Sequence, residues 1–477
     1  MDIQTMLAAH GDTIVRYALT GAKGGFARTL LAQTVHVPRL EAGILCDLDV
    51  AGTVALATEV GFDPARLRAC TTADEVAAAV ADGVVAVVAT PDLILPTGFD
   101  VLVEATGSPS FGSRVAQDAL EAGRHVAMVS KEVDSVAGIH LAAVAREHGV
   151  VYTPASGDQP ANLIALVGWV RTLGLEIVAV GKSSEYDLVL DPATGVVTQL
   201  DDQVHAPGLA DLLVLGDDVP ATLDARARAV EGLPVGATAD YCEMAVVATN
   251  TGTVSDVELM HYPVARIAEL ADVYALEEHG GIVRRPGVVD VFRALRTPAE
   301  ASFAGGVFVV VRTHDRETWE VLRGKGHVVS RDGRTACIYL PYHFMGVETP
   351  VNLLETVLLG GTYGSPTPTR TVVLAGRAKT DLAAGTTLHM GGHHHDVEGV
   401  QAVLVDAATL VGDATAASGT PVDPAPLYLA AHATLVRDVA AGELISVDDV
   451  DGHDPALLEA WRAGETTTAR RSVPGHV

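Results

Sequence analysis

The feature that most constrains the fold of this chain is an alternation of apolar, β-type runs with helical patterns over residues 14–155. Stretches with helical periodicity, such as SRVAQDALEAG, separate six apolar runs. Strands that alternate with helices form parallel sheets covered by helices. The sequence therefore predicts an α/β fold with an N-terminal, doubly wound parallel sheet. The six runs are TIVRYALT, EAGILCD, GVVAVVA, DVLVEATG, RHVAMVS and VVYTPA.

The length of 477 residues is too great for one hydrophobic core, because a domain usually takes about 100 to 200 residues. We expect the sheet domain over residues 1–160, an α+β catalytic or substrate domain over 161–365 and a small β-rich domain over 366–455. Gly, Ser, Thr and Pro cluster in GTYGSPTPTRT at 361–371 and mark the second boundary. The tail at 456–477 lacks apolar periodicity and is predicted to be flexible.

Composition excludes several classes of function. A formal net charge of −28 disfavours nucleic acid, whose phosphates are bound by clusters of Lys and Arg. No uncharged apolar run reaches the roughly 20 residues of a membrane span, and the N-terminus lacks a secretory pattern, so we expect a cytoplasmic protein without a membrane partner. The four cysteines form no CxxC pair and are interpreted as reduced thiols: Cys46, Cys70, Cys242 and Cys337.

Lysine is scarce in this sequence. Only five of the 32 basic residues are lysines, namely Lys23, Lys131, Lys182, Lys325 and Lys379. Arginine stays protonated, whereas burial can lower the pKa of a lysine. Lysines retained against this bias are therefore candidates for chemistry, with chance retention as the alternative.

The turn after the first apolar run reads TGAKGGFA at 20–27 and precedes the helical run ARTLLAQTV. Glycines allow the backbone to turn tightly and to approach a pyrophosphate, which then lies against the free N–H groups that begin the helix. The spacing is GxxGxxA rather than GxGxxG. We predict a nicotinamide dinucleotide on an N-terminal Rossmann domain, with an ordinary tight turn as the alternative. The predicted contacts in the turn are Gly21, Lys23, Gly24, Gly25 and Phe26.

The second apolar run ends at Asp47, where dinucleotide folds often place a carboxylate that binds the adenosine ribose. A 2′-phosphate about 4 Å from it would cost roughly 4 kcal/mol per charge pair at an effective dielectric of 20. NAD is therefore favoured over NADP, although Lys23 can compensate a phosphate and Asp47 can instead cap the following helix. Near the nicotinamide we expect Ala105, Thr106, Gly107 and Lys131.

Several motifs follow one another over roughly residues 14–450. They are VLVEATGSP at 101–109, SGDQP at 156–160, GKSS at 181–184, EMAVVATNTG at 243–252, GGIVRRPGVVD at 280–290, GKG at 324–326 and PYHFMGVETP at 341–350. With these motifs the chain resembles the homoserine dehydrogenase-like family with a C-terminal SAF domain, and most resembles its type II 1-deoxy-D-xylulose 5-phosphate reductoisomerase-like members. The resemblance implies hydride transfer between a nicotinamide and a small carbonyl compound. It also implies a SAF module, a compact β-clip fold, for the third domain.

Two departures from this family pattern bear on the chemistry. The sequences of reductoisomerase-like members contain a pattern similar to GKGKNN, whereas this chain reads GKSSEY at 181–186 and lacks the second cation and the two amides of that pattern. Val129-Ser130-Lys131 looks like the Asn-Lys motif of homoserine dehydrogenases, whose lysine lies beside substrate and cofactor. The resemblance then favours simple dehydrogenase chemistry.

Proton transfer is assigned to lysines. Reduction of a carbonyl leaves an alkoxide that must gain a proton, and a buried lysine with a lowered pKa can donate it. We predict this role for Lys131, at the carboxyl end of a strand, or for Lys182, in a loop after the strand-like run EIVAV, with a salt bridge between domains as the alternative. Asp158 and Glu243 are further catalytic candidates.

Other polar residues are predicted to bind substrate. Arg285 before a proline and Lys325 between two glycines suit a carboxylate or a phosphate, and a solvated loop is the alternative for both. Tyr342 and His343 suit an acid–base pair, or a packed aromatic ring with a polar neighbour. The predicted substrate-binding residues are Gln159, Asn250, Arg285, Lys325, Tyr342 and His343.

The run His393-His394-His395-Asp396 suggests a metal site at first sight. Consecutive side chains in a strand point to opposite faces and cannot all reach one ion. We predict a loop that faces the active site or solvent, and no metal site.

These features predict an NAD(P)-dependent oxidoreductase, a homodimer or homotetramer, that acts on a small hydroxylated or phosphorylated carbonyl or alcohol. Two alternatives stay open. One is a reductoisomerase, which usually needs a divalent cation to chelate an α-hydroxyketone. The other is a catalytically silent sensor that binds a nicotinamide without turnover.

Overall fold

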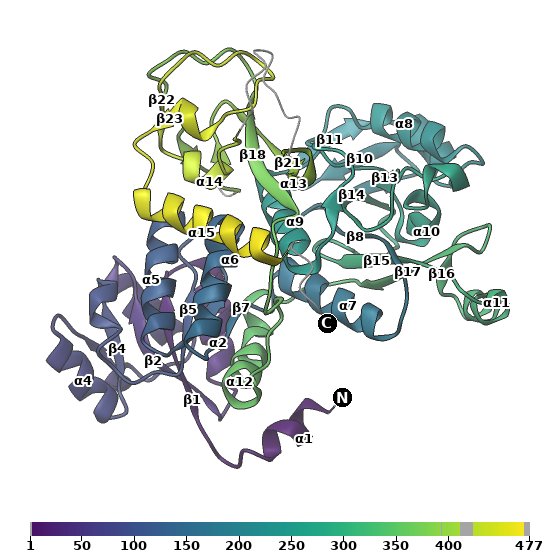
Figure 1. Ribbon diagram of the computed structural model, residues 1–477. Coiled ribbons are helices and arrows are strands. Elements are labelled where there is room, and N and C mark those ends of the chain that lie inside the picture. The colour runs from purple at the N-terminus through teal and green to yellow at the C-terminus, as the bar shows by residue number, and fades with distance from the viewer. Residues whose placement is uncertain (1, 393, 411–422, 472–477) are drawn as a thin grey trace.

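The computed structural model describes residues 2–392, 394–410 and 423–471 (Figure 1). Its N-terminal part is a seven-stranded sheet in the order β3-β4-β2-β1-β5-β6-β7, in which every pair is parallel. The α/β fold and the parallel sheet predicted from the sequence are thus confirmed. The strands are β1 (Val15–Thr20), β2 (Leu40–Cys46), β3 (Leu67–Ala69), β4 (Val85–Val88), β5 (Val101–Glu104), β6 (His125–Met128) and β7 (Tyr152–Pro154).

Both faces of this sheet are buried. Along β1, Tyr17 and Leu19 belong to one apolar cluster and Ala18 to the other, because successive side chains point to opposite faces. Strand β1 lies between β2 and β5, so the order of the strands changes direction at this point of the sheet. Open α/β sheets bind ligands in the crevice at the carboxyl ends of the strands at such a point. The helices of this part are α1 (Ile3–Ala8), α2 (Gly25–Thr34), α3 (Val50–Glu59), α4 (Ala73–Ala81), α5 (Pro109–Glu121) and α6 (Lys131–Glu147).

The middle of the chain forms a second, mixed sheet. Its path runs β11-β10-β9-β14-β8-β15-β17-β16, with β12 and β13 paired to β14. The strands are β8 (Ile177–Ser183), β9 (Leu188–Asp191), β10 (Val196–Gln199), β11 (Asp202–His205), β12 (Val254–Ser255), β13 (Val264–Ala265), β14 (Val288–Arg296), β15 (Val307–Arg312), β16 (Val328–Val329) and β17 (Thr335–Leu340). The helices are α7 (Gln159–Thr172), α8 (Val219–Ala229), α9 (Thr238–Thr251), α10 (Leu270–Val273) and α11 (Arg316–Gly324).

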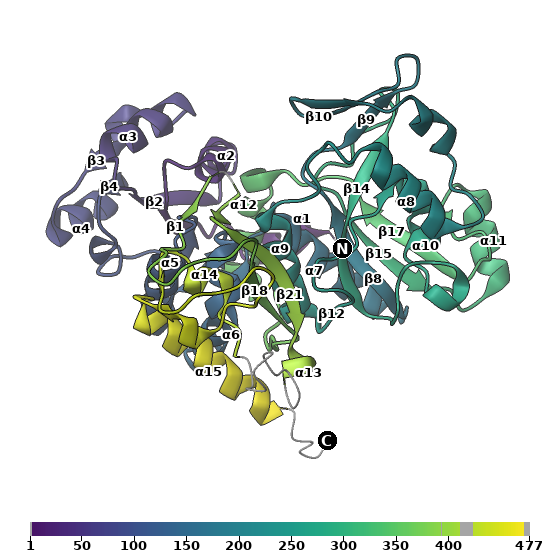
Figure 2. The same cartoon turned by 90° about the horizontal axis from the view of Figure 1, so that it is seen from above.

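The last part is rich in short strands and lies against α6 and α9 (Figures 1 and 2). Residues 381–385 (DLAAG) and 438–442 (DVAAG) share an Asp-apolar-Ala-Ala-Gly sequence. These two segments pair with each other, since Leu382 and Val439 exchange backbone hydrogen bonds of 2.9 and 2.8 Å. The strands are β18 (Val372–Ala378), β19 (Met390–Gly391), β20 (Asp396–Val397), β21 (Val400–Asp406), β22 (Thr434–Leu435) and β23 (Val450–Asp451), and the helices α13 (Ala407–Leu410), α14 (Leu427–Ala430) and α15 (Pro455–Arg471).

Two expectations about where helices form and pack need correction. The tail predicted to be flexible forms α15 up to residue 471; Leu457 and Trp461 are buried, and the helix lies along α5 and α6 (Figure 1). Residues 472–477 lie outside the described range. Helix α12 (Thr349–Leu359), which was expected in the middle domain, packs instead on α2 and β1 of the first sheet. Among the described residues no helix is long and apolar enough to cross a membrane.

Candidate active site

The glycine turn joins β1 to α2 and lies against the end of β5. Gly21 has a φ of +67°, and a Cβ atom there would lie 2.4 Å from the carbonyl oxygen of Ala105, so only glycine fits. Gly24 precedes α2 as its N-cap, and Gly25 is the first helical residue. The first N–H groups of a helix lack acceptors within it. The turn therefore offers backbone donors at the carboxyl edge of the sheet.

A groove of about 620 Å³ runs along this edge. Asp47 lies in it at the end of β2, and its carboxylate accepts hydrogen bonds of 3.0 Å from the backbone N–H groups of Lys23 and Asp49. Asp49 caps α3 by accepting from Gly52 at 2.8 Å, so the alternative role of Asp47 as a cap is wrong. The Lys23 ammonium forms an ion pair with Asp49 and is not a free cation in the groove. The groove is also lined by Gly21, Gly24, Ala105, Thr106 and Ser108.

A second cavity of about 450 Å³ continues from this groove, since both share Ala105 and Thr106 as lining residues. Side chains from all three parts of the chain surround it. Of the predicted site residues, the structure brings together here Phe26, Ala105, Thr106, Gly107, Lys131, Asp158, Gln159, Lys182, Glu243 and His343.

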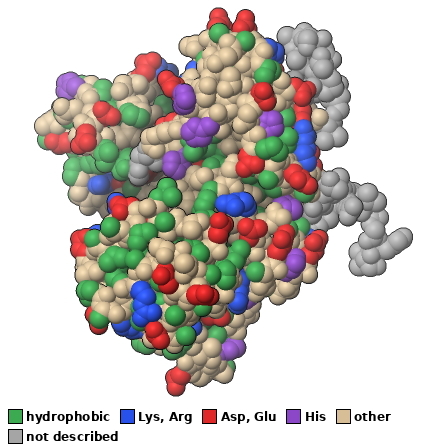
Figure 3. Space-filling view, turned by 90° about the vertical axis from the view of Figure 1, so that its left-hand side faces the viewer, with side chains coloured by type: hydrophobic (Ala, Val, Ile, Leu, Met, Phe, Trp, Pro, Cys, Tyr) green, Lys and Arg blue, Asp and Glu red, His purple; other side chains and the backbone are tan. Residues whose placement is uncertain are grey.

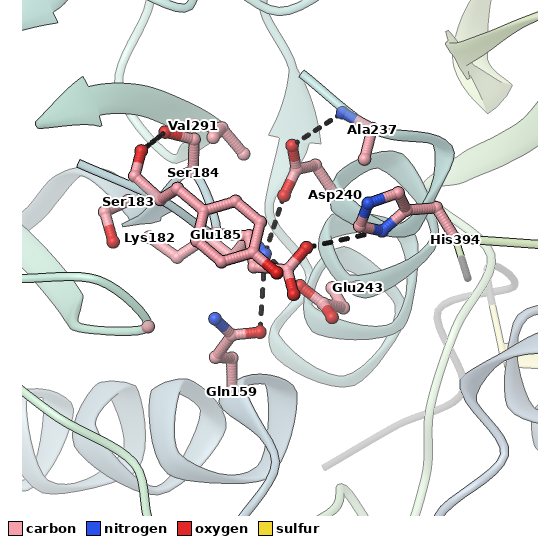
Figure 4. Close-up of polar contacts among 12 residues, drawn as sticks. Gln159, Lys182, Ser183, Ser184, Glu185, Ala237, Asp240, Glu243, Val291 and His394 are labelled. Atoms are coloured by element: carbon pink, nitrogen blue, oxygen red, sulfur yellow. Dashed lines mark hydrogen bonds and ion pairs between the residues drawn. The ribbon is translucent and has the colours of Figure 1, made fainter. Parts of the chain in front are cut away.

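The deepest part of this cavity holds two lysines that share one carboxylate. Lys131 Nζ lies 2.5 Å from Glu243 Oε1, and Lys182 Nζ contacts the other oxygen of Glu243. Lys182 also lies 2.7 Å from Asp240 Oδ1, one turn before Glu243 on α9 (Figure 4). The Gln159 amide, from the start of α7, donates to both Glu243 oxygens at 3.0 and 3.1 Å when its nitrogen faces them. Charge and hydrogen bonds thus hold this cluster rigidly.

The electrostatics of the cluster contradict the expected lowering of the lysine pKa values. Burial alone lowers the pKa of Lys131, but Asp158 and Glu243 outweigh it and raise that pKa well above its usual value. The pKa of Lys182 is raised in the same way, because Asp240 and Glu243 outweigh its burial. The pKa of Glu243 is lowered despite burial by the two ammonium groups. Both lysines therefore stay charged and are poor proton donors near neutral pH.

The SGDQP loop places Asp158 at the start of α7. Its carboxylate accepts a hydrogen bond of 3.0 Å from the backbone N–H of Gln159, and burial raises its pKa, with Lys131 opposing that shift. Gly157 has a φ of +88°, and a Cβ atom on it would lie 1.6 Å from the carbonyl oxygen of Met345. The loop is therefore packed tightly against the segment that carries His343, whose Nδ1 lies 3.2 Å from the Gly305 carbonyl oxygen.

The hairpin β19–β20 brings two histidines into the cavity from the last part of the chain. His394 Nδ1 lies 3.3 Å from Glu185 Oε2, and His395 Nδ1 lies 2.7 Å from Glu132 Oε1. Figure 4 shows His394 pointing toward Glu185. Asp396 accepts a hydrogen bond of 2.5 Å from Thr238 at the start of α9. His393 lies outside the described residues, and among those described no three His, Cys, Asp or Glu side chains are placed to hold a metal ion.

Four predicted substrate-binding residues do not line the cavity. Asn250 accepts from the Ser365 N–H at 2.8 Å and so anchors the linker. Arg285 pairs with Asp406 at 2.5 Å. Lys325 is exposed at the end of α11, and Tyr342 stacks on Phe344 with ring centroids 4.7 Å apart. The proposed anion clamp from Arg285 and Lys325 therefore has no support in the geometry.

Sequence analysis missed three carboxylates of the cavity. Asp240 precedes Glu243 by three residues, and this spacing places both on one face of a helix, which is a signal that could have been used. Glu132 directly follows Lys131, and Glu185 follows GKSS. Neither of these two has a local pattern that points to the cavity.

Comparison with known proteins gives one assignment. A family model described as the catalytic domain of oxidoreductase DRL matches residues 227–349. The matched family is one of oxidoreductases. The matched segment contains Asp240, Glu243 and His343 of the cavity, so this part of the site lies in a segment similar to an oxidoreductase catalytic domain. No curated protein matches the chain at a significant level.

Similar solved structures share low identity with the chain. The 1-deoxy-D-xylulose 5-phosphate reductoisomerase from Zymomonas mobilis in complex with NADPH is 15% identical over 50% of this chain and 58% of its own, with a TM-score of 0.30. A probable dehydrogenase from Thermotoga maritima is 12% identical over 74% of this chain and 91% of its own, with a TM-score of 0.38. The WlbA dehydrogenase from Bordetella pertussis, in complex with NADH and UDP-GlcNAcA, is 19% identical over 36% and 47%, with a TM-score of 0.24. The chain spans 58–59% of the first reductoisomerase structures, and likenesses at these scores do not specify a function.

Proposed function

We propose that the protein is an NAD(P)-dependent oxidoreductase that reduces a small hydroxylated carbonyl compound, or oxidises the matching alcohol, with NAD favoured over NADP. The observation that carries this proposal is the continuity of two cavities: the glycine-turn groove leads, through Ala105 and Thr106, to the buried cluster of Lys131, Lys182 and Glu243. The oxidoreductase family match over 227–349 agrees with it.

The residues that line the groove are of the types that bind a dinucleotide. Gly21 lies close to Ala105 and has no side chain that would cover the backbone of the turn. The start of α2 supplies free N–H groups for a pyrophosphate, and Asp47 supplies an acceptor for ribose hydroxyls. A bound nicotinamide would supply or accept the hydride of the reaction.

The two lysines have an electrostatic role in this proposal. When a carbonyl is reduced, its oxygen gains negative charge, and fixed positive groups stabilise that charge in a site with little water. Because Glu243 holds Lys131 and Lys182 in place, the two ammonium groups need not reorganise when the charge on the carbonyl oxygen develops. They orient and polarise the carbonyl, while another group gives the proton.

The charge of the cavity favours a substrate without phosphate. Two lysines face five carboxylates there, and no arginine lines the described part of the cavity. A phosphate would meet more carboxylates than lysines, at roughly 4 kcal/mol per pair at 4 Å for an effective dielectric of 20, and His394 and His395 are already in contact with Glu185 and Glu132. The carboxylates are Glu132, Asp158, Glu185, Asp240 and Glu243. We therefore narrow the substrate to hydroxylated, unphosphorylated compounds.

The same cavity gives the reductoisomerase alternative less support. Chelation of an α-hydroxyketone needs a divalent cation held by free carboxylates. Asp240 and Glu243 are already paired with the lysines, and the described residues offer no other set of metal ligands.

The experiment that tests the function is a screen of aldehydes, hydroxyketones and polyols with NAD and NADP, read by nicotinamide absorbance. Wild type is compared with Lys131→Met and Lys182→Met, which should keep nicotinamide binding by calorimetry and lose at least about 100-fold in turnover. Lys379→Met, an exposed lysine of the last domain, is the matched control and should be unaffected. Full turnover in both cluster variants would refute the role of the lysines. Nicotinamide binding without turnover on any compound would favour the sensor.

The preference for NAD is tested by replacing Asp47 with serine. The carboxylate disfavours a 2′-phosphate, and its loss should raise the affinity for NADPH relative to NADH by about tenfold, which corresponds to 1.4 kcal/mol. Calorimetric titration with both reduced nicotinamides measures the ratio. Asp49→Ser, beside Asp47, frees Lys23 from its ion pair and should change the ratio in the same direction. An unchanged ratio in both variants would remove Asp47 and Lys23 from the ribose site.

A further inference from the structure

His395 occupies an unusual position for a residue of the last domain. The hairpin β19–β20 carries it across to the first sheet, where a Cβ atom on Gly107 would lie 2.5 Å from its Cε1 atom. Its φ of +51° is uncommon for a residue with a side chain. Figure 3 shows histidine side chains scattered over this face of the molecule, some of them close together. The imidazole of His395 thus lies in the cavity beside Gly107, one of the residues that we expect near a nicotinamide.

A carboxylate from the first domain orients the ring. Glu132 Oε1 lies 2.7 Å from His395 Nδ1, and the Glu132 side chain is only 6% exposed. When one nitrogen of an imidazole is bound to a carboxylate, the tautomer and the orientation are fixed, and the other nitrogen is left to exchange a proton with a substrate. A Cβ atom on Gly107 would lie 3.3 Å from Nε2, so this second nitrogen lies beside Gly107, and both residues line the cavity.

We propose that His395 is the residue that exchanges the proton of the reaction, with Glu132 as its positioning partner. The proposal rests on the proposed function, since it assigns a step of that reaction. It makes the hairpin of the last domain part of the active site. The lysines remain the electrostatic groups of the cavity.

The proton balance of the step is simple. In the reducing direction the hydride from the nicotinamide joins the carbonyl carbon, and the electron pair of the C=O π bond moves to oxygen. The Nε2–H bond of the His395 imidazolium breaks as the new O–H bond forms, so one neutral imidazole and one alcohol result. The imidazole then takes a proton from water. In the oxidising direction the neutral imidazole accepts the proton of the alcohol.

The surroundings of His395 suit this exchange better than those of the lysines. Its hydrogen bond to Glu132 raises the pKa of His395, burial opposes the shift, and the nearby charges of Asp396 and Lys131 act in opposite directions. An imidazole is the side chain whose ordinary pKa lies close to neutral, where proton donors are efficient. Asp158, whose pKa burial raises, is the competing donor in the cavity.

The first test needs no turnover. Cofactor-free protein with ¹³C-labelled histidine is titrated by NMR, and the His395 resonance is assigned by its absence in His395→Gln. We expect His395 to titrate above 6.5, the ordinary histidine value, and we expect Glu132→Gln to move it down toward that value. A His395 resonance that titrates at or below 6.5 in wild type, or that ignores Glu132→Gln, would overturn the proposal.

The second test uses the substrate found in the screen. His395→Gln should lose about 100-fold in kcat of reduction at neutral pH while nicotinamide affinity is kept, and the fall of the wild-type rate at high pH should disappear. Free imidazole should restore part of the rate to His395→Ala, which a merely structural role would not allow. His389→Gln, an exposed histidine beside the same hairpin, is the control and should behave as wild type.

Three outcomes separate this inference from the proposed function. If wild type shows turnover and His395→Gln retains it with an unchanged pH profile, the inference fails and the function stands. Loss of the pH dependence in Asp158→Asn, but not in His395→Gln, would also overturn it and assign the proton to Asp158. If wild type binds no nicotinamide, the proposed function itself fails.

Discussion

Replacing Glu243 by alanine is expected to lower the free energy of unfolding by about 3–5 kcal/mol, because removing one partner leaves buried charge uncompensated. Glu243 is only 3% exposed and contacts both Lys131 and Lys182. Asp240 still pairs with Lys182, so the larger share of the loss falls on Lys131. Urea unfolding followed by circular dichroism measures the change. Turnover should fall below detection, since both ammonium groups lose the partner that positions them.

A surface carboxylate in an ion pair provides the matched control for this variant. Glu59 pairs with Arg28 at 2.7 Å, and its side chain is 63% exposed, so Glu59→Ala should leave the free energy of unfolding almost unchanged. Adding Lys131→Met to Glu243→Ala should recover part of the lost stability, because an apolar side chain then replaces the unpaired charge. Equal losses in Glu243→Ala and Glu59→Ala would contradict the buried cluster.

The N-terminal sheet was predictable because its signals are local. Each of the six apolar runs contains a strand, and β3 was missed because Leu67–Ala69 is short and largely exposed. The start of α2 at Gly25 follows from the glycine turn. By contrast, α15 was missed because its apolar residues are few, and the surface of α6 that buries them cannot be inferred from the tail itself.

The site was predictable in its residues but not in its electrostatics. Scarcity of lysine pointed to Lys131 and Lys182, and both line the cavity. The direction of their pKa values was predicted wrongly because it depends on Asp240 and Glu243. These carboxylates lie on α9, far from either lysine in the chain, and only the packing of α9 against α6 and α7 brings them together.

Long-range contacts also explain why the hairpin was left ambiguous. The sequence allowed the histidine run to face either the active site or solvent, and the contact between His395 and Glu132 spans 263 positions in the chain. Conversely, Arg285 and Lys325 looked like anion ligands only because a cation beside flexible backbone suits one. In the folded protein Arg285 forms an ion pair with Asp406, and the Lys325 side chain is exposed. The SAF module and the homoserine dehydrogenase-like chemistry stay predictions.

Gly21→Ala is expected to abolish measurable nicotinamide binding, with the dissociation constant raised by at least about 100-fold, or 2.7 kcal/mol. The left-handed φ of +67° costs an L-residue about 1–2 kcal/mol, and the new Cβ atom would overlap the Ala105 carbonyl oxygen at 2.4 Å. The turn must therefore move away from the end of β5, and this displaces the backbone donors that a pyrophosphate needs. Calorimetry with NADH and NADPH measures the loss.

A second glycine of the same domain separates this local effect from backbone strain. Gly123 has a φ of +75°, but a Cβ atom on it would meet nothing within 4 Å, and it precedes β6 at the edge of the sheet opposite the groove. Gly123→Ala should thus introduce a similar backbone strain, which lowers the thermal unfolding temperature. It should still bind the nicotinamide like wild type. Because the two variants share the strain but not the clash, a weaker affinity confined to Gly21→Ala locates the pyrophosphate at the turn. Wild-type affinity in Gly21→Ala would mean that the dinucleotide, if bound at all, lies elsewhere.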